Sequence, residues 1–337
     1  MNIKEMLFKL SSADAIGSVT EAKESALSLL SEYCETKLCD NGNIIGFLKG
    51  NSDYTLMLDA HIDQIGMVVT DVDEKGFLTV AKSGGIDLRA LPSRRVCVHS
   101  KEKITAVFCS APPHLSGDKE EYTDISEIKL DTALGEKARD IVSVGDYVTF
   151  CTKPEEMIGN LVCGRSFDNR AGVSCVIETA RRLCGKALPF NVALVLSDSE
   201  ELGLRGTRTA TFDVSPDEAV VIDVSFGDGI GISNEECGKL GKGGMIGISP
   251  SLDRGISNKL ILISEENNIP YQTEVMGGKT GTNADMVSLN KEGVRTCTLS
   301  VPLRNMHTDC EIVDISDIKS VCDLLEKYIL SGGVMNV

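Results

Sequence analysis

The chain has 337 residues, of which 42% are hydrophobic and 25% are charged, and its formal net charge at pH 7 is −16. The hydrophobic and charged fractions are ordinary for a globular protein with a sizeable core, which excludes the disordered and collagen-like classes. Because a strongly acidic surface repels phosphate groups and anionic lipids, neither nucleic acid nor a membrane is expected as a partner.

The N-terminal segment is predicted to form an amphipathic helix over residues 3–11, since charged and apolar residues alternate in it. It lacks the continuous apolar block of a signal peptide, and no apolar run elsewhere approaches the roughly 20 residues that span a bilayer. The twelve cysteines include no CxxC pair, and several lie in apolar stretches, as is typical of reduced thiols. The expected location is therefore the cytoplasm.

The next part of the chain changes from helix to strand. A second helix is predicted over residues 18–36, where alanine, leucine and tyrosine recur near helical spacing. Strand-like runs follow at 43–50 and 54–63. From residue 64 to residue 152, short strand-like runs are broken by Gly, Asp, Asn and Ser, which predicts a small barrel or sandwich.

Beyond about residue 158, strands alternate with helices. The expected strands are nearly unbroken apolar runs at 191–200, 219–227 and 294–302, and the expected helices lie at 171–183, 255–268 and 314–330. Such strands are typical of an α/β sheet that helices cover on both faces. The sequence therefore predicts an α/β domain of residues 1–67 and 157–337, interrupted by a small all-β, barrel-like domain of residues 68–156.

Polar residues at the ends of the apolar runs are the candidates for a functional site. They occur in the motifs DAHID (59–63), SFDNRAG (166–172), SDSEELG (197–203), VIDVS (221–225) and RNMHTD (304–309). In α/β sheets, functional groups gather at the carboxyl ends of the strands. We therefore expect these five motifs to converge.

Each motif taken alone has a simple structural explanation, because a single Asp after a strand usually caps a helix or turn and a histidine can pack in a core. The set as a whole is harder to explain in that way. If Asp168, Glu200, Glu201 and Asp223 share a partly dry cleft, their charges repel one another. Two divalent cations would balance those charges, and imidazole and carboxylate ligands suit zinc, cobalt or manganese.

Seven segments of the chain carry a resemblance to a known family. They are LDAHIDQIGMVV, DEKGFLTVAKSGGID, SFDNRAG, EELGLRG, ECGKLGKG, SPSLDRGIS and SVPLRNMHTD, in that order. With them the sequence resembles metallopeptidase family 42, the glutamyl, deblocking and tetrahedral-shell aminopeptidases, over nearly its whole length. The resemblance implies the two-metal exopeptidase fold with a mixed sheet, hydrolysis of peptides that have a free N-terminus, and a homo-oligomer.

The resemblance also implies a set of metal ligands. His61, Asp168, Glu201, Asp223 and His307 match the ligands of two divalent ions, with Asp168 as the bridge. One ion would take His61, Asp168 and Asp223. The other would take Asp168, Glu201 and His307. Zinc or cobalt is the first expectation for the metal, with manganese as a further option.

Two more residues match parts of the catalytic apparatus. Glu200 matches the general base, which takes a proton from water and passes it to the leaving amine, and Asp63 matches the carboxylate that orients His61. Related two-metal peptidases have a cis peptide bond after the bridging aspartate. One is therefore expected between Asp168 and Asn169.

The sequence departs from the family pattern at a few positions. Gln64 and Asn169 stand where the family usually has Glu and Asp, Ser199 stands where Gln is common, and 278–285 is a loose version of a Gly-Thr-Asp-Ala stretch. These changes bear on substrate preference and rate. Two alternatives stay open, a metal-dependent amidase or deacylase with the same site, and a catalytically silent binding protein, although an intact Glu200 argues against the latter.

Overall fold

The computed structural model describes residues 1–337 except 111, 113, 115–123, 234, 236 and 335–337. Its central element is an eight-stranded mixed sheet in the order β1-β2-β12-β3-β13-β16-β14-β15. The neighbours β12, β3, β13 and β16 run parallel, whereas β2 and β14 are antiparallel to the strands on their inner side. The strands are β1 (Glu35–Leu38), β2 (Ile44–Leu48), β3 (Thr55–His61), β12 (Asn191–Ser197), β13 (Glu218–Phe226), β14 (Gly244–Ile248), β15 (Tyr271–Val275) and β16 (Arg295–Leu303).

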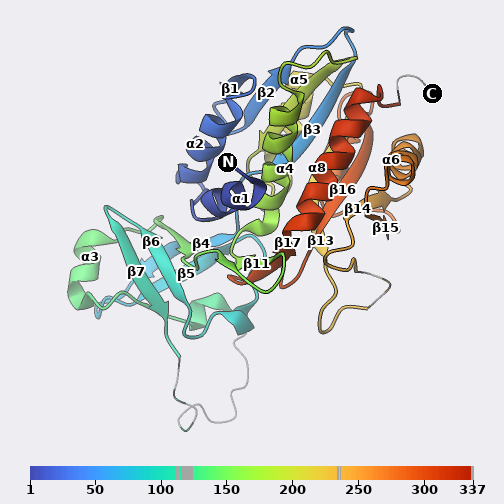
Figure 1. Cartoon of the computed structure of the whole chain (residues 1–337). Coiled ribbons are helices and arrows are strands. Elements are labelled where there is room, and N and C mark those ends of the chain that lie inside the picture. Colours follow the sequence, from blue (N-terminus) through green and yellow to red (C-terminus); the bar gives the residue numbers. More distant parts are fainter. Residues whose placement is uncertain (111, 113, 115–123, 234, 236, 335–337) are drawn as a thin grey trace.

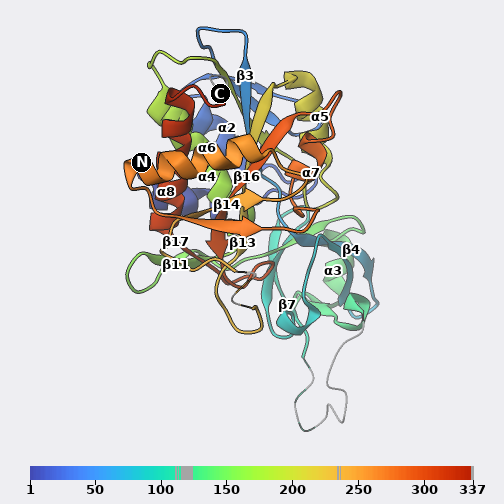
Figure 2. The same cartoon turned by 90° about the vertical axis from the view of Figure 1, so that its right-hand side faces the viewer.

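Helices cover both faces of this sheet (Figures 1 and 2). On β13, Val220 and Ile222 join one hydrophobic core while Ala219 and Val221 join another, because successive strand residues point to opposite faces. The first core includes residues of α1 (Ile3–Ser11), α2 (Glu21–Leu30), α4 (Phe167–Leu183), α6 (Arg254–Asn267) and α8 (Ile315–Leu330), and the second those of α5 (Arg205–Val214) and α7 (Ala284–Val287). The predicted mixed sheet with helices on both faces is confirmed.

The segment between β3 and α4 forms a closed barrel in the order β4-β5-β8-β7-β6-β9. Its interior is a separate hydrophobic core that includes Met67, Val98 and Phe108. Its elements are β4 (Gly66–Val72), β5 (Leu78–Ser83), η1 (Leu88–Ala90), β6 (Arg95–His99), β7 (Lys103–Phe108), η2 (Ile125–Glu127), β8 (Leu130–Asp131), η3 (Gly135–Lys137), α3 (Ala138–Ile141) and β9 (Tyr147–Phe150). The predicted all-β barrel is therefore confirmed, while the domain limits at residues 67/68 and 156/157 stay a prediction.

A small third sheet lies beside the start of α4. It consists of β10 (Glu155–Glu156), β11 (Leu161–Gly164) and β17 (Glu311–Asp314), with β11 in the middle. The antiparallel register places Gly164 opposite Glu311. This pairing brings the chain just before α4 next to the chain just after the fifth strand-end motif.

One predicted helix is longer than the observed one. The expected helix over 18–36 is observed only as Glu21–Leu30, because Glu35–Leu38 instead forms an edge strand that pairs with β2. Tyr33 and Cys34 still pack against the core from the turn between the helix and the strand. The helical spacing of apolar residues therefore extends beyond Leu30, where the helix itself ends.

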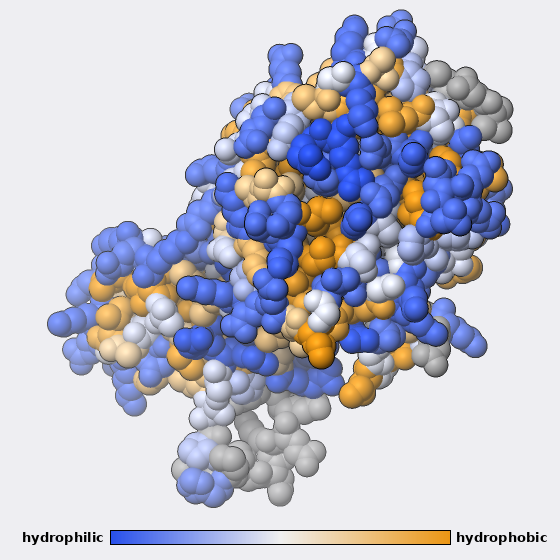
Figure 3. Space-filling model, in the orientation of Figure 1, coloured by the Kyte–Doolittle hydropathy of each residue, from blue (hydrophilic) through white to orange (hydrophobic). Residues whose placement is uncertain are grey.

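The face of the molecule in Figure 1 carries hydrophilic residues around its outline and hydrophobic ones near its middle, over α4, α8 and β11 (Figure 3). Within the described part of the chain, none of the helices combines the length and the apolar character needed to cross a bilayer.

A buried ion pair ties three parts of the fold together. Asp14, between α1 and α2, accepts a hydrogen bond from Arg165, which precedes α4, and lies 3.6 Å from Nε2 of His99 at the end of β6. Asp14 and Arg165 are each only 4% exposed. Removing one partner of such a pair strands the other charge in a poorly solvated place.

We expect Arg165→Met to lower the free energy of unfolding by about 3–5 kcal/mol, the typical cost of leaving one partner of a buried pair uncompensated. Urea unfolding followed by circular dichroism measures this loss. Arg295→Met is the matched control, because the pair of Arg295 with Asp253 is partly exposed and should contribute less than about 1 kcal/mol. Equal losses in the two variants would show that the buried pair is not special.

Candidate active site

The five strand-end motifs converge at the carboxyl edge of the central sheet. The parallel register pairs His61 on β3 with Ser197 on β12, and it pairs Asp59 with both Val195 on β12 and Val221 on β13. Because these neighbours run in the same direction, their carboxyl ends meet at one edge. The last residues of these strands, the loops that follow them and the first turn of α4 supply the side chains described below.

Asp168 lies between two histidines. Its Oδ1 is 3.0 Å from Nε2 of His61, and its Oδ2 is 3.2 Å from Nε2 of His307. The same His61 nitrogen is 3.7 Å from Oδ1 of Asp223, and the same His307 nitrogen is 3.4 Å from Oε1 of Glu201. Two groups of three side chains therefore share one carboxylate, and they are the two groups that the resemblance implied.

The atoms that could hold a cation are close together. One atom each from His61, Asp168 and Glu201 lies within 4.8 Å of the others. His61 is 1% exposed, and its Nδ1 has no hydrogen-bond partner, although it lies 3.4 Å from Oδ1 of Asp63. Imidazole and carboxylate groups at this spacing form a donor set that suits divalent first-row metals.

Asp63 holds the paired glutamates in place. Its Oδ1 accepts a hydrogen bond of 3.0 Å from the backbone N–H of Glu200, and its Oδ2 accepts one of 3.1 Å from the N–H of Glu201. The sequence predicted only that Asp63 orients His61. The carboxylate therefore also fixes the turn from which the two glutamate side chains project.

Glu311 holds the backbone of two other site residues in the same way, and the sequence did not predict this role. Its carboxylate accepts hydrogen bonds from the backbone N–H of Asp168 at 3.2 Å and of His307 at 3.0 Å. Glu311 is 1% exposed. The available signal was a glutamate at the start of an apolar run, four residues after a candidate ligand.

The barrel also reaches the site through a glycine pair. A Cβ on Gly84 would stand 3.2 Å from Oε2 of Glu201, and a Cβ on Gly85 would stand 2.7 Å from Nδ1 of His307. Gly84 also has a positive φ of 87°, which side-chain-bearing residues rarely adopt. The turn after β5 therefore forms one wall of the site, and glycine there leaves room for the side chains of Glu201 and His307.

Burial and mutual repulsion control the ionisation of these side chains. Burial raises the pKa of Glu200 to about 7, and it raises the pKa of Asp223 well above its ordinary value. Although burial also opposes the charge of Asp168, the two histidines beside it hold its pKa well below the usual range. The carboxylates in turn raise the pKa of His307 to about 11, against the effect of its own burial. The pKa values of the histidines and of Asp168 are thus set mainly by the attraction between imidazole and carboxylate.

The positions that depart from the family pattern serve local structure. Gln64 accepts hydrogen bonds from the N–H of Ala15 and from Arg170, both at 3.1 Å. Asn169 accepts a hydrogen bond from the N–H of Gly172 and donates one to the carbonyl of Ile222, both at 2.9 Å. The expected cis peptide bond between Asp168 and Asn169 is present.

A second polar network lies beneath the site. The Asn283 amide donates hydrogen bonds of 2.7 Å to Asp59 and 2.9 Å to Ser197. Burial raises the pKa of Asp59 to about 6. The loose motif at 278–285 therefore supplies Asn283 as a bridge between β3 and β12.

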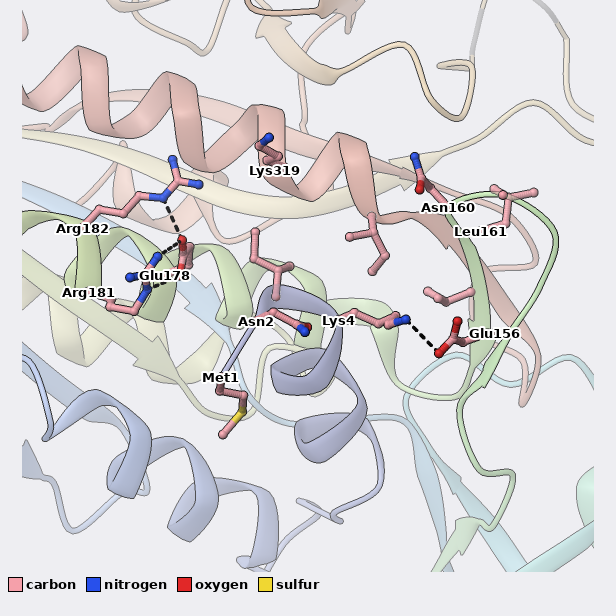
Figure 4. A pocket seen from close by; sticks show the side chains of 14 residues that line it. Met1, Asn2, Lys4, Glu156, Asn160, Leu161, Glu178, Arg181, Arg182 and Lys319 are labelled. Carbon is pink, nitrogen blue, oxygen red and sulfur yellow. Dashed lines mark hydrogen bonds and ion pairs between the residues drawn. The ribbon is translucent and has the colours of Figure 1, made fainter.

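A cavity of about 450 Å³ next to α1, α4 and α8 lies apart from this site (Figure 4). Residues of α1, α4 and α8 line it, and none of the predicted site residues is among them. Most of its charged side chains are paired, Arg181 and Arg182 with Glu178 and Lys4 with Glu156. We find no convergent unpaired group among its described residues.

Comparison with known proteins gives consistent matches. The family described as M42 glutamyl aminopeptidase matches residues 42–324. The chain is 28% identical to the lysyl aminopeptidase of Pyrococcus furiosus, covering 86% of this chain and 85% of that one. The structure of aminopeptidase APDkam598 from Desulfurococcus kamchatkensis superposes with a TM-score of 0.92 at 29% identity, covering 98% and 95% of the two chains.

A further solved structure, the TET1 peptidase of Pyrococcus horikoshii, is described as assembling into a tetrahedron or a large octahedral shell. It matches with a TM-score of 0.86 at 28% identity, covering 98% of this chain and 99% of that one. The family match extends over most of the sequence, and the structural matches extend over nearly all of it. The chain therefore belongs to the M42 glutamyl aminopeptidase family and is an aminopeptidase, a hydrolase.

Proposed function

We propose that this chain hydrolyses the N-terminal residue from peptides with the help of two divalent metal ions. The observation that carries the proposal is the position of Asp168, whose two oxygens each face a different histidine. Membership of a metallopeptidase family implies that a divalent metal is used. The imidazole and carboxylate donor set, with Nε2 of His61 facing both Asp168 and Asp223, fits such ions.

We assign His61, Asp168 and Asp223 to one ion and Asp168, Glu201 and His307 to the other. When bound, the two ions would supply positive charge that makes water easier to deprotonate and stabilises the negative charge that develops on the carbonyl oxygen. Zinc and cobalt suit these ligands, as does manganese.

Glu200 is proposed as the general base. It takes a proton from the attacking water and delivers a proton to the amine that leaves when the peptide bond breaks. Burial keeps its pKa above that of an ordinary glutamate, as suits a base that works near neutral pH. Asp63 holds Glu200 and Glu201 through their backbone N–H groups, so that one side chain serves proton transfer while the other serves as a ligand.

We further propose that residues 1–67 and 157–337 form the catalytic domain and that residues 68–156 form an inserted domain. The closed barrel with its own hydrophobic core supports this division. The assemblies described for the Pyrococcus horikoshii relative support a homo-oligomer for this chain as well. The particle mass measured by light scattering checks that assembly, and a monomer would contradict it.

Metal removal should abolish activity and lower the melting temperature together. Activity is measured with aminoacyl-p-nitroanilides. Release of the free amino acid from these substrates distinguishes an aminopeptidase from an amidase or deacylase. A ligand that binds only the folded state adds about 2.7 kcal/mol at 100 times its Kd, so returning zinc, cobalt or manganese should restore the lost stability. Full activity after exhaustive chelation would contradict the two-metal proposal.

A further inference from the structure

A second cavity, of about 460 Å³, opens beside the proposed metal site. One of its lining residues is Ser225, which lies two residues beyond Asp223 on β13. Residues two apart on a strand point to the same face of the sheet, so the hydroxyl of Ser225 projects on the same side as the carboxylate of Asp223. The cavity extends from there toward β14 and β15, at the edge of the sheet.

Glu274 on β15 places a carboxylate in this cavity. It accepts a hydrogen bond from the hydroxyl of Ser225 and another, 3.2 Å long, from the hydroxyl of Ser300. The described residues that line the cavity include no Lys, Arg or His. Among the described residues, the Glu274 carboxylate accepts side-chain hydrogen bonds only from these two neutral hydroxyls, and burial raises its pKa. A half-buried carboxylate of this kind is stabilised when a cation comes within reach.

The rest of the cavity is suited to an apolar stem. Met245, Met276 and Phe226 contribute to its lining. Methionine side chains adapt their shape to flexible hydrocarbon chains. An aliphatic stem that ends in a positive charge therefore finds an apolar surface along its length and a carboxylate near its end. A substrate side chain that carries a carboxylate is repelled by the negative charge of Glu274.

We propose that this cavity receives the side chain of the substrate's N-terminal residue and that Glu274 selects lysine or arginine there. The inference rests on the proposed function, because a peptide whose terminal residue lies at the metal site has that residue's side chain beside Asp223 and Ser225. Glu274 is a specificity-determining residue in this account. It pairs with the cationic head of the substrate, while the methionines and Phe226 contact its stem.

The test compares kcat/KM for lysyl-, arginyl-, leucyl- and glutamyl-p-nitroanilide on the metal-loaded enzyme. The wild-type enzyme should prefer the two basic substrates over the glutamyl one. In Glu274→Gln, the ratio of lysyl to leucyl kcat/KM should fall by about 10–100-fold, the usual worth of a hydrogen bond to a charged group. Glu265→Gln is the matched control. Glu265 is a surface glutamate on α6 that accepts a hydrogen bond from Tyr271, which lies on β15 with Glu274, and its replacement should leave the ratio unchanged.

Each result has a distinct meaning. A wild-type preference for the glutamyl or leucyl substrate overturns the inference and leaves the proposed function standing. An equal loss on every substrate in Glu274→Gln also overturns it, because Glu274 would then be structural. Absence of amino acid release from any substrate, by the metal-loaded wild-type enzyme, overturns the proposed function itself. Melting temperatures of the two variants, compared with the wild type, show whether each remains folded.

Discussion

Replacing Glu200 by glutamine is expected to lower turnover by about 10²–10⁴-fold while both metals remain bound and the fold stays unchanged. Glutamine is nearly isosteric with glutamate, but it cannot accept a proton from water at neutral pH. The backbone N–H of residue 200 still donates to Asp63, so the turn that carries the side chain is preserved. Steady-state kinetics and elemental analysis on the purified variant measure the two quantities.

Glu201→Gln provides the contrast, because its side chain belongs to the group around His307. This variant should lose metal as well as rate. The two glutamates are neighbours and are held by the same aspartate, so a general disturbance of the turn would affect both variants alike. If Glu200→Gln keeps near-wild-type turnover, or if it loses metal first, the two roles have been assigned in the wrong order.

Replacing Asp168 by asparagine should be more disruptive for metal binding than any other single change at the site. The substitution preserves size but removes a charge, and it replaces one of two oxygens that face separate histidines with an amide group. Changes to residues that merely support a ligand typically cost about 10–100-fold in metal affinity or activity. A change to the shared carboxylate should exceed that range in both. Metal titration by isothermal calorimetry, together with kinetics, measures the loss.

Glu218→Gln is the matched control for Asp168→Asn. Glu218 is a fully buried carboxylate at the opposite end of β13, where it accepts hydrogen bonds from the hydroxyls of Tyr54 and Tyr328. Replacing Glu218 should affect stability at most, because Glu218 lies at the amino end of β13 and not at the proposed metal site. A similar loss of metal in both variants would mean that the effect comes from the fold and not from the bridge.

The sequence alone was sufficient to predict that these side chains lie close together, because strand-end positions are visible in a one-dimensional pattern. The buried strands β12 and β13 contain apolar runs that end at Ser197 and Asp223, and polar residues near the carboxyl ends of neighbouring parallel strands must share one edge of the sheet. Charge balance among the carboxylates then pointed to cations. The family resemblance supplied the individual roles, which the observed distances support.

Other parts of the site could not be predicted, since they depend on contacts between distant segments. Glu311 acts on Asp168, 143 residues away, and nothing in its local sequence reveals that partner. Asn283 reaches Asp59 across 224 residues in the same way. Glu274 lies on the edge strand β15, and the sequence of this strand does not distinguish Glu274 from any other partly exposed residue. Pairing between strands, rather than local propensity, decides where these side chains come to lie.

The glycine pair after β5 has a consequence for how the barrel can be exchanged. Because a Cβ at either position would press on Glu201 or His307, the barrel is not an independent module that can be replaced at will. A barrel grafted from a relative must place a turn of the same shape at the same position, or the side chains of Glu201 and His307 are displaced. Recombination between members of the family is therefore constrained at two residues of the insert, however well the rest of the grafted barrel folds.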